Sequence, residues 1–159
     1  MSGQTFYTVT LLTKAVLAKD IFELRFTKPA GFDFVAGQFV QFRVPDGEKF
    51  VLRSYSISSI STDAYLEFCI KILPDGKASA WFAQMAVGSM AELGVPRGMF
   101  VVQQATDAPS YYIATGTGMA PVMSMVTTAA AADRFATAEV LFGVRSEEDL
   151  FWVDRLRAL

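Results

Sequence analysis

The sequence predicts a chain of two parts, in which an antiparallel β structure is followed by a parallel α/β segment. Up to about residue 105, apolar and polar side chains alternate along several short stretches that Pro- and Gly-rich turns separate, which is typical of a barrel or sandwich. After Pro109 the pattern becomes strand, glycine-rich turn, helix, strand and helix, which is typical of a parallel sheet. We therefore expect domains at residues 1–105 and 106–159.

In the first part, the alternating stretches indicate strands with one face buried in a core. These stretches are residues 22–27, 40–44 and 66–72, and turn residues occupy 29–31, 45–47 and 74–76. One helix interrupts the strands. It is expected to open near Ser79, because Trp81, Phe82, Met85 and Ala86 recur at helical spacing.

In the second part, strands are expected at 111–115 and 138–144, and helices at about 120–135 and 147–157. Parallel sheets normally have more strands than two and are covered on both faces. We therefore expect an incomplete α/β domain with an apolar edge. Such an edge predicts a homodimer or a completing partner chain.

Composition excludes several classes of protein. Hydrophobic residues make up 52% and charged residues 19%, with a net charge of −2, so the chain is neither disordered nor basic enough to indicate nucleic-acid binding. There is no apolar run of membrane-spanning length and no secretory signal at the first residues. These features predict a cytoplasmic protein.

The sequence holds no histidine and a single cysteine, Cys69. This excludes Ser-His-Asp triads, His-ligated zinc or haem, internal disulfides and iron–sulfur clusters within the chain. What remains is a binding protein, a carboxylate enzyme, or an enzyme whose cofactor carries the chemistry. No metal site is expected.

Three short motifs carry the functional interpretation. Gly116-Thr117-Gly118 follows an expected strand, and Pro121 suits the first turn of the helix that comes next. Glycines allow a close approach to phosphate at a helix N-terminus, but Pro121 stands where a third glycine of the dinucleotide fingerprint would be. A ligand-free glycine turn is the alternative.

The second motif is Arg53-Ser54-Tyr55-Ser56. Arg53 and Tyr55 share one face of a strand, where a guanidinium and an aromatic ring suit a ligand with both phosphates and rings. A solvent-facing cation–π pair is the alternative. The third motif, Gly76-Lys77-Ala78-Ser79, opens the helix of the first part. It either holds a phosphate or simply uses Ser79 as the N-cap.

Taken together and in this order, the motifs resemble the ferredoxin–NADP reductase family, and the Pro-Asp-Gly-Lys-x-Ser form of residues 74–79 resembles its bacterial subclass. Residues 34–39, 95–100 and 142–145 match as well. The resemblance implies a six-stranded antiparallel FAD-binding barrel and an NAD(P)-binding α/β domain. It also implies electron transfer between NAD(P)H and a separate carrier such as ferredoxin or flavodoxin. The alternative is a non-catalytic flavin-binding relay subunit that needs a partner chain for NAD(P)H oxidation.

The resemblance also implies residue roles. Arg53, with Ser54 beside it, should contact the FAD pyrophosphate, and Tyr55 and Ser56, the expected catalytic residues, should lie against the isoalloxazine ring. The remaining expected cofactor contacts are the main chain of Cys69, Ile70 and Lys71, the pyrophosphate cradle of Gly76, Lys77, Ala78 and Ser79, and the nicotinamide-nucleotide turn of Gly116, Thr117, Gly118 and Pro121.

The choice between NADP and NAD depends on Arg145, at the end of the second parallel strand. Arginine suits a 2′-phosphate, which favours NADP. The alternative is a surface arginine paired with Glu147, Glu148 or Asp149, and NAD stays possible.

Overall fold

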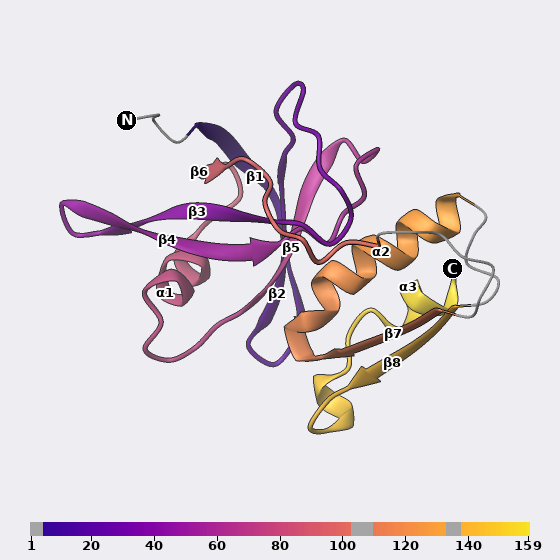
Figure 1. Cartoon of the computed structure of the whole chain (residues 1–159). Helices are drawn as coiled ribbons and strands as arrows, with labels where there is room; N and C mark the ends of the chain where they lie inside the picture. Colours follow the sequence, from indigo (N-terminus) through magenta and orange to yellow (C-terminus); the bar gives the residue numbers. More distant parts are fainter. Residues whose placement is uncertain (1–4, 103–109, 133–137) are drawn as a thin grey trace.

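The fold consists of a six-stranded antiparallel sheet followed by a two-stranded parallel sheet with helices, in a computed structural model that describes residues 5–102, 110–132 and 138–159 (Figure 1). The strands of the first sheet are β1 (Phe6–Ala18), β2 (Ile21–Thr27), β3 (Phe39–Asp46), β4 (Lys49–Ser56), β5 (Tyr65–Lys71) and β6 (Met90–Gly94). The order in the sheet is β4-β3-β6-β1-β2-β5. This confirms the expected antiparallel barrel.

The two edge strands of this sheet, β4 and β5, meet at one isolated antiparallel bridge between Ile57 and Phe68. The bridge closes the sheet towards a barrel. Inside it, Phe26, Phe42, Phe68 and Phe82 are almost fully buried and pack edge-on or tilted against one another, for example Phe42 against Phe68 at 5.0 Å between ring centroids. Phe82 comes from the one helix of the barrel, α1 (Lys77–Gln84).

The expectation that each strand buries a single face is wrong for β2 and β5. Glu23, Glu67 and Cys69 lie on the polar side of the alternation, yet all three are buried, with Glu67 at 0% exposure. The reason is that residues of the second part cover the outer face of these strands. Ile21 and Cys69 share a core cluster with Met119, Phe151 and Trp152.

The second part forms β7 (Ser110–Thr115), the 3₁₀ turn η1 (Gly116–Gly118), α2 (Met119–Ala131) and β8 (Ala138–Gly143). β7 and β8 pair in parallel from Ser110 with Ala138 to Thr115 with Gly143, as expected. The expected helix end at 135 and the domain boundary between 105 and 106 lie outside the described residues.

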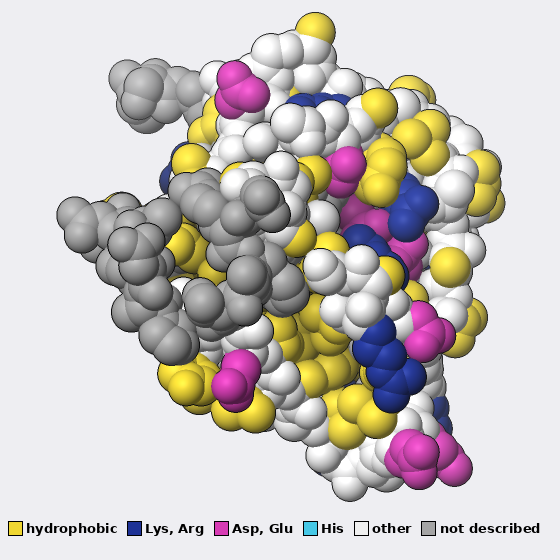
Figure 2. Space-filling model, turned by 90° about the vertical axis from the view of Figure 1, so that its right-hand side faces the viewer, with side chains coloured by type: hydrophobic (Ala, Val, Ile, Leu, Met, Phe, Trp, Pro, Cys, Tyr) yellow, Lys and Arg dark blue, Asp and Glu magenta, His cyan; other side chains and the backbone are white. Residues whose placement is uncertain are grey.

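One face of this parallel sheet is uncovered. Tyr111 is 62% exposed, Ile113 70% and Leu141 52%, whereas Tyr112, Val140 and Phe142 on the other face pack onto the cluster beneath α2. Figure 2 shows hydrophobic side chains gathered beside charged ones on the side of the molecule that it presents. The two-stranded sheet therefore exposes an apolar face, where the sequence led us to expect an apolar edge.

The expected continuous helix over 147–157 is wrong. The segment forms a 3₁₀ turn, η2 (Glu147–Asp149), and a short α-helix, α3 (Val153–Arg157). Trp152, between them, has a left-handed backbone with φ of 59°. This break turns Phe151 and Trp152 inward, where Phe151 packs edge-on against Phe142 at 5.1 Å. No helix of the described ranges is long and apolar enough to cross a membrane.

Candidate functional site

The central feature of the site is a stretch of strand β5 that pairs with β2 along one edge and is open along the other. At the bridge between the edge strands, the Ser58 N–H donates to the Glu67 main-chain oxygen at 2.8 Å. Beyond the bridge, the same register would set Ser56 opposite Cys69 and Tyr55 opposite Ile70. The strand pairings of the described residues include no ladder there. The two strands therefore separate next to the Arg53–Ser56 motif.

The direction of the β5 main chain follows from its hydrogen bonds. The Glu67 N–H donates to Ser59 Oγ at 3.1 Å, so both main-chain groups of Glu67 face away from β2, whereas the Ile72 N–H turns back to the Asp20 oxygen at 2.7 Å. Main-chain direction alternates along a strand. The Cys69 carbonyl and both main-chain groups of Lys71 therefore face the open edge, where they can hydrogen-bond a flat polar ring.

Tyr55 stands beside this edge. Its ring is half-buried and packs edge-on against Phe82 at 5.2 Å and Phe42 at 5.9 Å. These are its ring contacts within the described residues, rather than the cation–π pair with Arg53 considered above. Burial raises the pKa of Tyr55, and the charge of Arg53 offsets part of this, so the phenol is protonated at neutral pH. Arg53 is exposed and donates to the Leu52 oxygen at 2.9 Å.

Helix α1 begins at Lys77, with Gly76 as the N-cap residue and no side-chain cap. Ser79 does not cap this helix, which was the alternative to phosphate binding, because its hydroxyl lies two residues inside the helix and accepts the Leu73 N–H at 2.9 Å. A Cβ at Gly76 would approach Ser79 Oγ at 2.6 Å, so the tight turn favours glycine here. The main-chain N–H groups of Lys77, Ala78 and Ser79 have no intrahelical acceptor.

Lys77 does not point freely to solvent. Its ammonium pairs with both carboxylate oxygens of Asp46, at 2.6 and 2.7 Å. Both side chains are partly exposed, so the pair contributes little to stability. An anion at the helix N-terminus would compete with Asp46 for Lys77.

The glycine turn of the second part leaves room for a ligand. Gly116 has φ of +49°, and a Cβ at Gly116 or Gly118 would meet no atom within 4 Å. Thr117 is partly exposed between them, and Pro121 is buried in the first turn of α2. The turn contacts strand β5. The structure thus brings this motif next to the open strand edge, although the two are far apart in the sequence.

The side chain of Cys69 points away from the open edge, into the core cluster shared by the two parts. Burial raises the pKa of this thiol, as do the charges of Glu23 and Glu67 nearby. The thiol is therefore neutral at physiological pH and unreactive. If residues 69–71 contact a cofactor, Cys69 does so through its main chain.

Arg145 follows β8 and is exposed. Its Nε lies 3.3 Å from Oδ2 of Asp149, one turn further along. The structure thus contains one of the surface pairs considered as an alternative to phosphate binding. The pair is exposed and weak, and it does not prevent Arg145 from meeting an anion.

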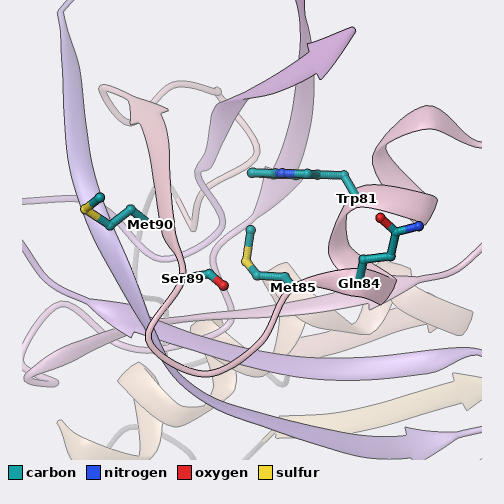
Figure 3. Close-up of a pocket in the computed structure, with 5 residues that line it drawn as sticks. All are labelled: Trp81, Gln84, Met85, Ser89 and Met90. Carbon is teal, nitrogen blue, oxygen red and sulfur yellow. The ribbon is translucent and has the colours of Figure 1, made fainter. Parts of the chain in front are cut away.

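A cavity of about 310 Å³ lies elsewhere on the barrel (Figure 3). Its lining comes from the C-terminal end of α1 and from the chain that enters β6, namely Trp81, Gln84, Met85, Ser89 and Met90. None of the residues expected in the site lines it. Among the described residues, no group of His, Cys, Asp and Glu could hold a metal ion.

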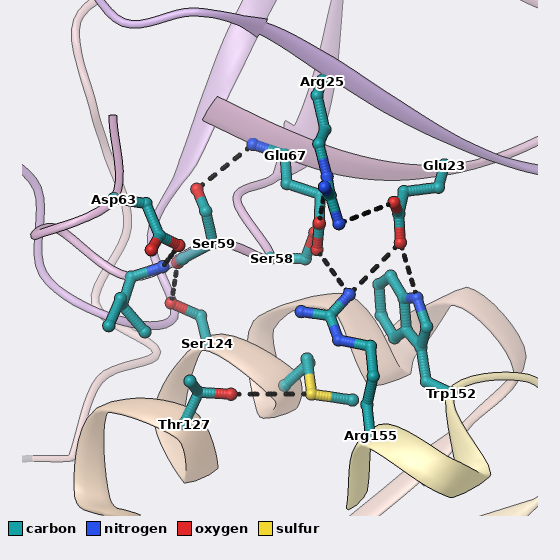
Figure 4. Close-up of polar contacts among 12 residues, drawn as sticks. Glu23, Arg25, Ser58, Ser59, Asp63, Glu67, Ser124, Thr127, Trp152 and Arg155 are labelled. Atoms are coloured by element: carbon teal, nitrogen blue, oxygen red, sulfur yellow. Dashed lines mark hydrogen bonds and ion pairs between the residues drawn. The ribbon is translucent and has the colours of Figure 1, made fainter. Parts of the chain in front are cut away.

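Sequence reasoning missed a buried polar network between the two parts (Figure 4). Arg155 Nη1 donates to Oε1 of Glu67 at 2.9 Å and to Oε2 of Glu23 at 3.2 Å. Arg25 bonds the same two carboxylates, at 2.9 and 3.0 Å. The sequence signal was available, since Glu23, Arg25 and Glu67 are charged residues of apolar strands, but alternation alone assigns them to solvent.

These features define a class. A barrel with an open strand edge beside an aromatic ring, joined to a βα unit with a glycine turn, is suited to bind a flavin and a nicotinamide nucleotide side by side. Comparison with known families agrees. Residues 8–102 match the oxidoreductase FAD-binding domain family, and residues 112–159 match the oxidoreductase NAD-binding domain. The chain belongs to the oxidoreductase FAD-binding domain family.

Curated proteins of related sequence are also oxidoreductase components. The chain is 39% identical over 128 residues to methane monooxygenase component C of Methylosinus trichosporium, covering 80% of this chain and 37% of that protein. It is 34% identical over 140 residues to ferredoxin–NADP reductase B of Sorangium cellulosum, covering 86% of this chain and 57% of that protein. The chain thus spans about half the length of such relatives, or less.

Among solved structures, a ferredoxin NADP⁺ reductase from Neisseria gonorrhoeae with bound FAD and NADP superposes with a TM-score of 0.89. It is 28% identical, and the match covers 99% of this chain and 65% of that protein. The resemblance to the ferredoxin–NADP reductase family is confirmed. The roles of individual residues stay predictions.

Proposed function

We propose that this chain binds FAD at the open edge of β5 and takes part in electron transfer between NAD(P)H and a separate one-electron carrier of the ferredoxin or flavodoxin kind. The observation that carries the proposal is the position of strand β5. Its Cys69 carbonyl and the main-chain groups of Lys71 face the gap beside Tyr55, and the same strand contacts the Gly116–Gly118 turn. One strand therefore adjoins both expected cofactor positions.

The residues present fit FAD. Tyr55 offers a ring face, and the main chain of Cys69 and Lys71 offers hydrogen-bonding groups for the edge of the isoalloxazine. Arg53 is exposed on the same strand as Tyr55, and its guanidinium suits pyrophosphate oxygens. The N-terminus of α1 adds unpaired N–H groups and a positive dipole end.

FAD and NAD(P)H supply the redox chemistry when bound, including the change from two-electron to one-electron transfer. The chain orients them and excludes water. Ser56 ends β4 beside the opening, and we expect its hydroxyl to hydrogen-bond a ring nitrogen of the flavin. Gly116 and Gly118 allow the nucleotide to approach, while Thr117 lies between the two positions. Such alignment of two reacting groups lowers the barrier to transfer between them.

For the nucleotide, we propose NADP, bound through Arg145 at its 2′-phosphate. The exposed position of Arg145 at the end of β8 supports this. Asp149 should weaken NADP binding, because its carboxylate already pairs with the guanidinium of Arg145. Replacing Asp149 by Asn should therefore strengthen binding of NADPH relative to NADH, and Arg145→Ala should weaken it. A preference for NADPH over NADH that is unchanged in both variants would show that Arg145 does not bind the 2′-phosphate.

The proposal is tested by an anaerobic absorbance spectrum of the purified chain with FAD, before and after addition of NADPH or NADH. Bound flavin should give resolved bands, and the reduced nucleotide should bleach them. Bands that persist would favour a second function, a flavin-binding relay subunit completed by another chain. A chain that does not retain FAD at all would exclude both.

The second function is favoured by the uncovered face of β7 and β8, with Tyr111, Ile113 and Leu141 exposed. A homodimer or a completing partner chain that covers this face stays our prediction, as does the cytoplasmic location. Light scattering of the pure chain distinguishes a dimer from a monomer. Ile113→Lys, on this face, should abolish self-association if the face is used, whereas Val16→Lys on the exposed side of the barrel should not.

A further inference from the structure

The two parts of the chain are joined by a charged network that the proposed function does not use. Glu67 is completely buried, and Glu23 is nearly so. Both carboxylates belong to the barrel, and each accepts hydrogen bonds from Arg155 of α3. Figure 4 shows Arg155 reaching from its helix towards both carboxylates, with Trp152 beside it. We call Glu23, Glu67 and Arg155 the interdomain clamp.

The charges of the clamp are balanced by one further residue. Arg25, on the barrel, pairs with Glu23 at 3.0 Å and with Glu67 at 2.9 Å. Ser58 adds a hydroxyl donor to Glu67 at 3.0 Å. With Arg155 present, two carboxylates face two guanidiniums. Without it, one buried negative charge loses its counterpart, and the closed arrangement of the two parts becomes unfavourable.

The clamp acts on the strand that the site depends on. Glu67 lies two residues before Cys69 on β5, and the Cys69 carbonyl and the main-chain groups of Lys71 face the proposed flavin position. The Gly116–Gly118 turn contacts the same strand from the other part. A second link supports this geometry, since Ser124 of α2 donates to the Ser59 oxygen at 2.6 Å. Movement of α3 away from β5 would therefore carry the glycine turn away from the flavin edge.

We propose that Arg155 is a positioning residue that holds the nucleotide turn against the flavin strand by bridging Glu67 and Glu23. The inference rests on the proposed function for its consequence, but the clamp itself can be tested without any cofactor. Arg155 touches neither the open strand edge nor the glycine turn. Arg155 affects the site indirectly, because it holds the second part of the chain against the barrel.

The reactivity of Cys69 can report how tightly the two parts of the chain pack against each other. Cys69 is the only cysteine of the chain, and its thiol is buried between β5 and the residues around Met119 and Trp152. The rate of reaction with a soluble thiol reagent under native conditions therefore measures how often the two parts separate. Arg155→Ala should react at least about tenfold faster than the parent chain, because the variant loses a partner of two buried carboxylates.

Two controls make this measurement specific. Arg157→Ala lies on the same helix and pairs only weakly with the fully exposed Asp154, at 3.7 Å, so it should react at the parental rate. Lys14→Met removes a contact between β1 and the end of α1 that involves none of the clamp residues. When the two variants are compared at equal free energy of unfolding, it should react more slowly than Arg155→Ala. A parental rate for Arg155→Ala, or equal rates for Arg155→Ala and Lys14→Met, would overturn the clamp.

The consequence for function is measured in the chain with bound FAD, as FAD affinity and as the rate of flavin reduction. Arg155→Ala should keep the parental FAD affinity and lose at least about tenfold in the rate of flavin reduction at saturating NADPH, and Arg155→Lys should recover part of it. Reduction at the parental rate by Arg155→Ala would overturn the positioning role. If the parent chain reduces no flavin, the proposed function fails, and the Cys69 rates still decide whether the clamp exists.

Discussion

Trp152 donates its indole N–H to Oε2 of Glu23 at 2.8 Å, across 129 positions of sequence. The tryptophan reaches this carboxylate because its backbone adopts a left-handed conformation between η2 and α3. Such a conformation is unfavourable for a residue with a Cβ. The hydrogen bond and the packing of the indole against Phe151 at 5.1 Å offset this cost. The contact thus orients α3 so that Arg155 meets Glu67.

The first prediction concerns this contact. Trp152→Phe keeps an aromatic ring and the same backbone strain but removes the donor to Glu23, which is 9% exposed. We expect a loss of about 1–3 kcal/mol in the free energy of unfolding, because a buried acceptor loses a partner. Urea unfolding followed by far-ultraviolet circular dichroism measures this. Arg157→Ala, on the surface of the same helix, is the control and should change the free energy by less than about 0.5 kcal/mol.

This contact also marks where sequence reasoning stopped. The barrel strands, β7, α2 and β8 could be predicted because alternation and helical spacing are local signals. The break at Leu150–Trp152 could not, since the helical pattern of 147–157 is locally consistent. The break accompanies the hydrogen bond from Trp152 to the Glu23 carboxylate on β2. A tertiary contact outweighed local propensity there.

The candidate site also has one part that local sequence patterns predict and another part that they do not. Short motifs located Tyr55, Lys77 and the Gly116–Gly118 turn, because glycine turns and helix N-termini have recognisable chemistry. The open edge of β5 has no motif, since it arises from where β4 stops pairing. Pairing between distant strands is a property of the folded chain, so the groups that face the opening were identified only through the resemblance to a family.

A second prediction concerns the end of helix α1. The ammonium of Lys14 on β1 donates to the main-chain oxygens of Phe82, Ala83 and Met85, at 2.9, 2.7 and 3.2 Å. These carbonyls lie at the C-terminal end of α1, where a cation is favourable. Lys14→Met should lower the free energy of unfolding by about 1–2 kcal/mol.

Hydrogen exchange shows whether the loss is local. The amides of α1 should exchange faster in Lys14→Met, while those of β2 keep their protection relative to global unfolding. Lys19→Met removes an exposed lysine from the turn after β1 and is the matched control. Equal stability of the two variants would contradict the capping role.

A third prediction tests the pyrophosphate position. Arg53 is exposed, and its guanidinium donates to the neighbouring Leu52 oxygen, so Arg53→Ala should leave the free energy of unfolding nearly unchanged. FAD affinity should fall about tenfold to hundredfold, because a charge-assisted contact to phosphate is lost. Lys49→Ala, on the same strand and also exposed, should bind FAD as the parent does. Fluorescence titration with FAD measures both, and an unchanged affinity in Arg53→Ala would place the pyrophosphate elsewhere.

A fourth prediction concerns alkaline pH. Burial raises the pKa of the Cys69 thiol above its ordinary value of 9.0. Above that value the unfolded chain releases this proton while the native chain keeps it, so the free energy of unfolding falls as pH rises. Below about pH 8 the thiol has no effect on the pH dependence.

The comparison with Cys69→Ala isolates this effect. Between pH 8 and 10.5 the parent chain should lose about 2 kcal/mol more than the variant, since each pH unit above the ordinary pKa costs about 1.4 kcal/mol. Burial also raises the pKa values of Tyr55 and Tyr65, but these act equally in both proteins. Parallel curves of stability against pH for the parent and Cys69→Ala would show that the thiol is not buried in solution.

The last prediction concerns a close contact between the two parts. Gly37 has φ of +100°, and a Cβ there would lie 2.0 Å from the Phe100 oxygen and 2.4 Å from Cε of Met125 on α2. Gly31, in the preceding turn, has φ of +70° and open space around it. Gly31→Ala therefore measures backbone strain alone and should cost about 1–2 kcal/mol. Gly37→Ala adds a clash with a main-chain oxygen that cannot rotate away, and should cost at least about 3 kcal/mol in urea unfolding. Equal costs in the two variants would mean that the loop of Gly37 does not pack against Phe100 and α2 as described.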